Sequence, residues 1–195
     1  GVSLIKQLLA KSDVLAENFK VGSLAKFGLD YESIHAEFPS IVYCSITGYG
    51  QDGPYAKRPG YDMAAQGLGG IISITGEADG PPSKVPIAVN DVITGLYASI
   101  SILAALKHRD LTGQGQQIDL ALLDVQVAWL YNQGVNYLLS GEVPERLGTG
   151  HPNIVPYQAF EASDGFIILG AANEDAFFRF CEFTENLSLL DDPRF

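Results

Sequence analysis

Positive charge is scarce in this sequence. Its 195 residues include 12 lysines and arginines against 23 aspartates and glutamates, which gives a formal net charge of −11. A protein that binds nucleic acid needs clustered lysine and arginine to neutralise phosphates, so the composition argues against a nucleic-acid partner. A few local cations can still hold one phosphate group, and a small anionic ligand is therefore compatible with this charge.

Long uninterrupted apolar runs are also missing. The most apolar segment, residues 92–106, is broken by Gly95 and by several hydroxyl side chains, whereas a membrane span needs about 20 predominantly apolar residues. We therefore expect a core helix in this segment and no membrane partner. With 47% hydrophobic and 18% charged residues, the chain has the composition of a globular protein, and its length suits one or two domains.

Cysteine and histidine are few and dispersed. Cys44 and Cys181 lie far apart in hydrophobic contexts, which predicts buried thiols and fits a reducing cytosol, so we expect a cytoplasmic protein. His35, His108 and His151 have neither metal-ligand spacing nor the neighbours of a catalytic triad. We therefore expect no metal site. The chain has no initiator Met and no basic-then-apolar leader, and we expect an excised piece without a signal peptide.

Short β-branched and aromatic runs alternate with segments of helical periodicity. Strands are expected at 13–17, 41–46 and 116–121. Helices are expected near residues 4–9, 31–38, 61–72, 91–107, 124–139 and 174–183, with a further short helix that Ser23 caps and Gly28 ends. This alternation predicts the α/β class, with a Rossmann-like parallel sheet covered by helices.

The character of the sequence changes after Gly141. Prolines and glycines between residues 144 and 156 predict a loop that could link two domains. Residues 157–170 then read as a β-hairpin around the turn at Ser163-Asp164-Gly165. We place a boundary near residue 150, with an incomplete Rossmann-like domain over 1–150 and the start of a smaller α+β domain over 151–195.

Two features of the first part could carry chemistry. The glycine-rich loop 48–55 follows a predicted strand, at the edge where α/β folds place ligands, although it could also be a simple connection. Asp124 lies where a predicted strand meets a helix, and a carboxylate there is stabilised by the free N–H groups of the helix N-terminus. The alternative is that Asp124 is merely a helix cap. The residue pattern alone does not decide whether loop 48–55 binds a ligand or whether Asp124 takes part in chemistry.

Five blocks of the chain resemble consecutive blocks of the family III CoA transferases. They are AENFKVGSLAKFGL from Ala16, SITGYGQDGPY from Ser45, RPGYD from Arg58, GQGQQIDLALLD from Gly113 and HPNIVPYQAF from His151. The blocks stand in the order of the family and cover nearly the whole chain. The resemblance is closest to dicarboxylate types such as the succinyl-CoA:glutarate transferases. It implies an enzyme that transfers CoA between an acyl-CoA thioester and a free carboxylic acid, of which this chain is a central piece.

The resemblance also implies roles for particular residues. Asp124 matches the nucleophilic aspartate, and Lys26 stands where the family places a cation near the CoA phosphates. A turn and a loop that match CoA contacts comprise Asn18, Phe19, Lys20, Pro59, Gly60, Tyr61 and Asp62. Some relatives carry a lysine where this chain has Pro59, so the resemblance does not decide whether the Pro59 side chain contacts CoA. Residues that could form an oxyanion site or an acyl pocket are Gly48, Tyr49, Gly50 and His151.

The implied reaction runs through a covalent aspartyl intermediate and needs no metal or cofactor beyond coenzyme A as substrate. The family resemblance further implies an interlocked homodimer. Two alternatives remain. Racemases of the same superfamily resemble this chain at Asp91, but they use a histidine base that this chain does not match in sequence. A piece of this length could also be an inactive module that binds CoA or serves assembly.

Overall fold

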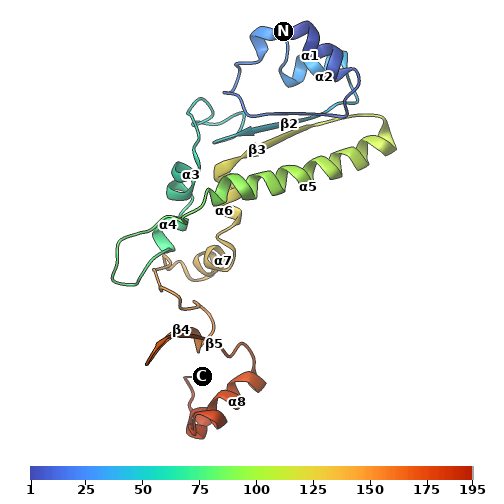
Figure 1. The fold of residues 1–195 in the computed structure, drawn as a ribbon. Coiled ribbons are helices and arrows are strands. Elements are labelled where there is room, and N and C mark those ends of the chain that lie inside the picture. The colour runs from blue at the N-terminus through green and yellow to red at the C-terminus, as the bar shows by residue number, and fades with distance from the viewer. Residues whose placement is uncertain (195) are drawn as a thin grey trace. The chain divides into compact units, whose positions relative to one another are not determined.

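The computed structural model describes residues 1–194, and Figure 1 shows the order of their helices and strands. Two compact units divide the chain, one formed by residues 1–73 and 84–142 and the other by residues 74–83 and 143–195. Each unit is described by itself below. The domain boundary expected near residue 150 concerns the longer protein and stays a prediction.

A three-stranded parallel sheet organises the first unit. Strands β1 (Val14–Glu17), β2 (Val42–Thr47) and β3 (Gln117–Ala121) lie in the order β1-β2-β3, with Cys44 paired to Ala16 on one side and to Ile118 on the other. The central strand is buried from Val42 to Ser45, as expected for a parallel strand covered on both faces. The predicted parallel α/β fold is confirmed.

The first unit also contains helices, of which α5 and α6 contact the sheet. They are α1 (Val2–Leu9), the 3-10 helix η1 (Ala25–Phe27), α2 (Tyr31–Glu37), α3 (Asp62–Leu68), α4 (Ile71–Ile74), α5 (Val89–Thr112), α6 (Leu122–Ala128) and α7 (Tyr131–Ser140). A cluster of buried residues joins the first two α-helices to the sheet and consists of Leu9, Leu29, Ile34, Ile41 and Tyr43. The Tyr43 hydroxyl donates a hydrogen bond to the Leu29 carbonyl at 2.7 Å, and burial raises its pKa well above the usual value.

Three local expectations from the sequence were wrong. The helix expected at 61–72 is divided into α3 and α4 because Gly70 has a φ of +93°, a conformation that is easy for glycine. The helix expected at 124–139 is divided into α6 and α7, and Tyr131 has a φ of +46° there. Ser23 does not cap the short helix, whose N-cap is Leu24, although Gly28 ends it in the left-handed conformation as predicted.

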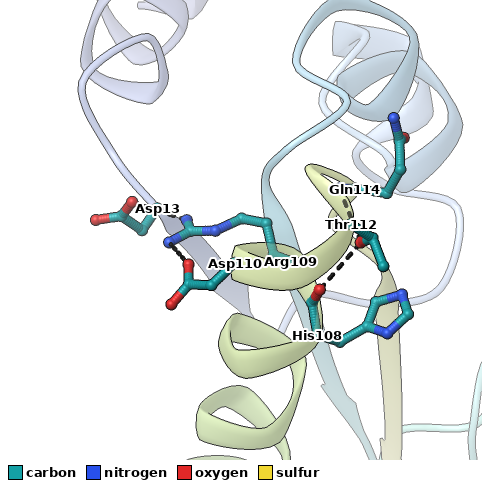
Figure 2. Close-up of polar contacts among 6 residues, drawn as sticks. All are labelled: Asp13, His108, Arg109, Asp110, Thr112 and Gln114. Atoms are coloured by element: carbon teal, nitrogen blue, oxygen red, sulfur yellow. Dashed lines mark hydrogen bonds and ion pairs between the residues drawn. The ribbon is translucent and has the colours of Figure 1, made fainter.

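The long helix α5 packs against β2, β3, α3 and α6, and Figure 1 shows it running alongside the sheet. An ion-pair cluster fixes its C-terminal end (Figure 2). The Arg109 guanidinium binds Asp13, just before β1, at 2.7 Å and Asp110 at 3.2 Å. The hydrogen bonds with Asp13 and then Asp110 raise the pKa of Arg109 further. The end of α5 is thereby tied to the start of the sheet.

α5 meets the length and composition criteria of a membrane span, as do core helices of soluble proteins. Its contacts with two strands and two helices agree with a core helix. One side of it is nevertheless uncovered in this chain, since Leu96, Ile100 and Leu103 are 55%, 66% and 67% exposed.

The second unit contains a separate two-stranded sheet. β4 (Tyr157–Ala162) and β5 (Gly165–Gly170) pair antiparallel, which confirms the predicted hairpin. α8 (Glu174–Phe183) and the 3-10 helix η2 (Leu187–Asp191) follow. Asn173 caps α8, because its side-chain oxygen accepts a hydrogen bond from the Ala176 N–H at 2.9 Å. Cys181 of this unit and Cys44 of the first are both buried and free, as expected from the sequence.

Candidate functional site

A cavity of about 590 Å³ opens in the first unit, where β1 and β2 end. The carboxyl edge of a parallel sheet is the usual place for a ligand in α/β folds. The lining comes from residues 18–21, 46–48 and 58–62, together with Ala56, Asp91, Thr94, Gly95 and Leu122. The first two turns of α5 and the first residue of α6 therefore meet the loops at this edge.

The cavity gathers the turn and the loop that sequence resemblance assigns to CoA. Their members that line it are Asn18, Phe19, Lys20, Pro59, Gly60, Tyr61 and Asp62. The rings of Phe19 and Tyr61 are 61% and 69% exposed, so they offer apolar surface to a ligand. Lys20 and Arg58 add positive charge to the lining. Arg58 also lies over the Tyr55 ring, with its guanidinium carbon 4.0 Å from the ring centroid.

Two glycines allow the loops of the site to cross. The backbones of Gly48 and Gly60 are so close that a Cβ on either residue would overlap the Cα of the other. The Gly48 carbonyl also accepts a hydrogen bond from the Leu123 N–H at 3.1 Å. The glycine-rich loop, the CoA-type loop and the start of α6 therefore meet at Gly48, which lines the cavity.

The rest of the glycine-rich loop makes hydrogen bonds and a ring contact with neighbouring residues of the first unit. The Gly50 N–H donates to the Thr47 hydroxyl at 2.9 Å, and the Gln51 N–H donates to Asp119 Oδ2 at 2.9 Å. The Tyr49 ring packs edge-on against Tyr55. Gly50 and Tyr49 are not in the cavity lining, whereas Gly48 is. The oxyanion or acyl-pocket role assigned to this loop stays a prediction.

Two carboxylates, Asp62 and Asp91, line the cavity. Asp62 Oδ1 accepts hydrogen bonds from the backbone N–H groups of Asn90 at 2.9 Å and Asp91 at 3.3 Å. The pKa of Asp91 is raised, first because partial burial disfavours its charged form and second because of the negative charge of Asp62. A carboxylate with a raised pKa in a cavity is a candidate for chemistry.

Besides Tyr49 and Gly50, three further residues predicted for the site are not in the cavity lining. Asp124 is the third residue of α6 and is exposed, although Leu122 of the same turn lines the cavity; residues two apart on a helix do not share a face. Lys26 is exposed in η1, with its ammonium 4.9 Å from the Phe27 ring centroid. His151 belongs to the second unit, where its Nδ1 accepts a hydrogen bond from the Asn153 N–H at 3.0 Å. Their roles stay predictions.

Sequence reasoning did not assign Asp91 or Arg58 to this site. Asp91, Thr94 and Gly95 have the spacing i, i+3 and i+4, so they share one face of α5. That small and polar face interrupts the apolar stretch at the start of the helix, and this interruption was the available signal. Within residues 1–194, no group of three or more His, Cys, Asp or Glu side chains is placed to hold a metal ion.

Comparisons with known proteins identify the family of this chain. The model of CoA-transferase family III matches residues 1–195. A succinate–glutarate CoA-transferase of Agrobacterium fabrum is 51% identical over the whole chain, which covers 49% of that protein. The human succinyl-CoA:glutarate CoA-transferase is 44% identical over the whole chain, which covers 44% of it.

A solved structure is also similar to this chain along its whole length. A CAIB/BAIF family protein from Brucella suis superposes with a TM-score of 0.82 at 49% identity, and the match covers 100% of this chain and 52% of that one. The chain thus spans about half the length of the curated relatives it matches. Because the family model matches the whole chain, the chain belongs to CoA-transferase family III.

Proposed function

We propose that the protein of which this chain is a part transfers CoA between an acyl-CoA thioester and a free carboxylic acid. The observation that supports this most is the cavity, which gathers the CoA-type turn and loop around a carboxylate. Lys20 and Arg58 suit the phosphates of CoA, because charge-assisted hydrogen bonds to phosphate are strong. The exposed rings of Phe19 and Tyr61 suit its apolar parts.

The reaction we propose proceeds through a covalent aspartyl intermediate. A carboxylate oxygen attacks the thioester carbonyl, the CoA thiolate leaves, and a mixed anhydride forms. The thiolate then attacks the aspartyl carbonyl of the anhydride, which releases the donor acid and leaves an aspartyl-CoA thioester. The acceptor acid repeats these two steps in reverse order and leaves as the new acyl-CoA, and the carboxylate is regenerated. Covalent catalysis here conserves the thioester energy between the two acids.

The nucleophile we propose is Asp124, which the family resemblance assigns to this role. Asp124 is exposed in the first turn of α6, and Leu122 of the same turn lines the cavity. Asp91 lines the cavity and has a raised pKa, and it is therefore the alternative carboxylate. The backbone N–H groups around Gly48 and Gly60 are candidates for stabilising the oxyanions that form during attack.

The relatives suggest the substrate class. Two of them are named for succinate or succinyl-CoA together with glutarate, and we propose a dicarboxylic acid as acceptor. Racemisation is less well supported, because no histidine is among the residues that line the cavity in the described chain. The uncovered apolar side of α5 suits the interlocked homodimer that the family resemblance implies, and we propose that assembly, in the cytoplasm, for the whole protein.

Trapping of the intermediate tests the proposal. The full-length protein is incubated with succinyl-CoA and then with hydroxylamine, which converts an aspartyl thioester into a hydroxamate. We expect mass spectrometry to find the adduct on the peptide that contains Asp124. An adduct on the Asp91 peptide would move the nucleophile there. Transfer of CoA without any enzyme adduct would overturn the covalent mechanism.

A further inference from the structure

One peptide group in the first turn of α6 is held from both sides. This group joins Leu122 to Leu123, so it contains the Leu122 carbonyl and the Leu123 N–H. The carbonyl accepts a hydrogen bond from the side-chain amide of Asn90 at 3.0 Å, and the N–H donates to the Gly48 carbonyl at 3.1 Å. Because a peptide group is planar, bonds at its two opposite sides fix its orientation. Asp124 is the next residue of the same turn.

The turn depends on partners from outside its own helix. The first N–H groups of an α-helix have no acceptor within the helix, and the N-cap residue Ala121 makes no side-chain cap. For Leu123, the Gly48 carbonyl is that acceptor. The Leu122 carbonyl has two lone pairs, so it can bond to its own helix and also accept the Asn90 amide. The start of α6 is therefore set by α5 and by the glycine-rich loop.

Asn90 is itself fixed at the start of α5. It is fully buried, and its backbone N–H donates to Asp62 Oδ1 at 2.9 Å. Its backbone carbonyl accepts the Thr94 hydroxyl at 2.8 Å. Asp62 and Thr94 line the cavity, whereas Asn90 does not. Any effect of the Asn90 side chain on a bound ligand therefore passes through the groups that it holds.

We propose that Asn90 is a positioning residue for CoA transfer. Through the Leu122 carbonyl it orients the first turn of α6, and with that turn the Asp124 carboxylate, relative to the loops that line the cavity. The family resemblance assigns no role to Asn90. The inference rests on the proposed function, because it takes Asp124 as the nucleophile, and it adds a buried side chain outside the cavity on which the reaction depends.

Three variants of the full-length protein remove the bond in different ways. Asn90→Leu keeps a branched side chain but has no donor, and Asn90→Ala removes both the donor and the volume. Asn90→Asp keeps the shape, but it donates to the Leu122 carbonyl only when its carboxyl group is protonated. Since a small misplacement of a reacting group can cost on the order of 100-fold in rate, we expect kcat to fall by roughly 10- to 100-fold in the leucine and alanine variants.

CoA binding and folding are measured on the same samples. The dissociation constant of CoA, measured by calorimetry, should change by less than about twofold, because the residues of the cavity lining are unchanged. Circular dichroism at the assay temperature gives the folded fraction, and kcat is expressed per folded enzyme. Ile34→Val is the matched control. It removes a methyl group from a fully buried side chain of α2, outside the cavity lining, and should lower stability without changing kcat.

The pH dependence of Asn90→Asp tests the hydrogen bond itself. Burial raises the pKa of a carboxyl group, and nearby negative charge raises it further. The elements on which α5 packs, namely α3, α6, β2 and β3, contain no lysine, arginine or histidine. The ionisable groups around position 90 are Tyr43, Cys44, Asp62, Asp119 and Asp124 on these elements, Asp91 on α5, and Lys20 and Arg58 in the cavity lining. Negative charges outnumber positive ones, so protonation of the new carboxyl is favoured.

Protonation at low pH should therefore restore the donor. We expect the kcat of Asn90→Asp, relative to that of the wild type at the same pH, to rise by about tenfold or more between about pH 9 and about pH 6. The same ratio for Asn90→Leu should stay constant, because leucine has no proton to gain. The ratio to the wild type removes the titration of Asp124, which both proteins share.

Each outcome decides the question. A lower kcat per folded enzyme with unchanged CoA affinity, together with recovery of Asn90→Asp at low pH, supports the positioning role. A normal kcat in folded Asn90→Leu would overturn it. A kcat ratio of Asn90→Asp that does not change with pH would also overturn it, even if the other two variants fail to fold. So would a rise of about tenfold or more in the CoA dissociation constant with kcat retained. Near-normal transfer by Asp124→Asn would instead refute the proposed nucleophile, and that result differs from each of the others.

Discussion

The side-chain amide of Asn90 donates a hydrogen bond to the Leu122 carbonyl at 3.0 Å. This bond joins the second residue of α5 to the first residue of α6, and Asn90 is fully buried. A buried side-chain hydrogen bond therefore joins the two helices that begin at the cavity. The Oδ1 atom of Asn90 has no hydrogen-bond partner within the described chain. The side-chain amide is therefore stabilised through its nitrogen, by the bond to Leu122.

We expect Asn90→Ala to lower the free energy of unfolding of the full-length protein by about 1–3 kcal/mol, because the Leu122 carbonyl loses its buried donor. Chemical denaturation measures the change. Gln7→Ala, at an exposed position of α1, should stay within about 0.5 kcal/mol of the wild type. Equal stability of the Asn90 and Gln7 variants would show that the α5–α6 bond contributes nothing measurable.

Gly60→Ala should disturb the site itself. A Cβ at this position overlaps the backbone of Gly48, and neither loop can yield by rotating a side chain. We expect a loss of about 1–3 kcal/mol in stability, as for other overpacked positions, together with weaker CoA binding in calorimetry. Gly67→Ala is the matched control, because the nearest atom to its Cβ would be at 3.8 Å. Normal CoA binding by the Gly60 variant would contradict the crossing of the loops.

Cation removal tests how the cavity holds CoA. Arg58→Ala and Lys20→Ala should each raise the dissociation constant of CoA by about tenfold, because charge-assisted hydrogen bonds contribute roughly 1.5–3 kcal/mol. The loss should shrink at high salt, since screening already weakens the wild-type contact. Lys57→Ala removes a neighbouring charge that is not in the cavity lining and should have little effect.

The variant Lys26→Glu tests whether Lys26 also contributes to CoA binding. If Lys26 lies near the CoA phosphates, as the resemblance implies, its reversal should weaken CoA binding more at low salt than at high salt. Its position outside the cavity lining predicts a smaller effect than that of Arg58→Ala. Equal affinity of the Lys26 variant and the wild type would remove Lys26 from the CoA site.

The sequence predicted the strands better than the breaks in the helices. The three parallel strands followed from β-branched and aromatic runs, since local propensity and burial agree there. The break between α6 and α7 could not be predicted, because Tyr131 has a positive φ that its side chain does not favour. Such a conformation is imposed by packing across the fold rather than by the local sequence.

Some residues of the site could likewise be predicted from the sequence, and others could not. The CoA-type turn and loop were found because each is a contiguous motif. Asp91 was not assigned to the transfer reaction, since its place beside that loop depends on the hydrogen bonds between Asp62 and the start of α5. Asp62 is far from Asn90 and Asp91 in the sequence, and no local sequence pattern predicts their hydrogen bonds.

The isolated chain should associate in solution. Leu96, Ile100 and Leu103 expose more than half of their side chains along one side of α5, and apolar surface of this kind marks an interaction site. We expect analytical ultracentrifugation of residues 1–195 to find oligomers or aggregates. Replacement of Ile100 and Leu103 by lysine should reduce the association, whereas Lys107→Ala should not. A monodisperse, cooperatively folding wild-type monomer at high concentration would contradict this prediction.

Asparagine variants of the two candidate nucleophiles give the sharpest test of the chemistry. Asp124→Asn keeps the size of the side chain but removes the anionic nucleophile, so we expect CoA transfer to fall by at least about 10³-fold, as when a covalent nucleophile is lost. CoA binding and the melting temperature should stay close to those of the wild type, because the Asp124 side chain is exposed. Asp91→Asn should retain more of the activity, because it leaves the Asp124 carboxylate in place. Steady-state assays with succinyl-CoA and glutarate, on variants checked for deamidation, measure both. The reverse result, with Asp91→Asn inactive and Asp124→Asn active, would move the nucleophile to Asp91, which lines the cavity.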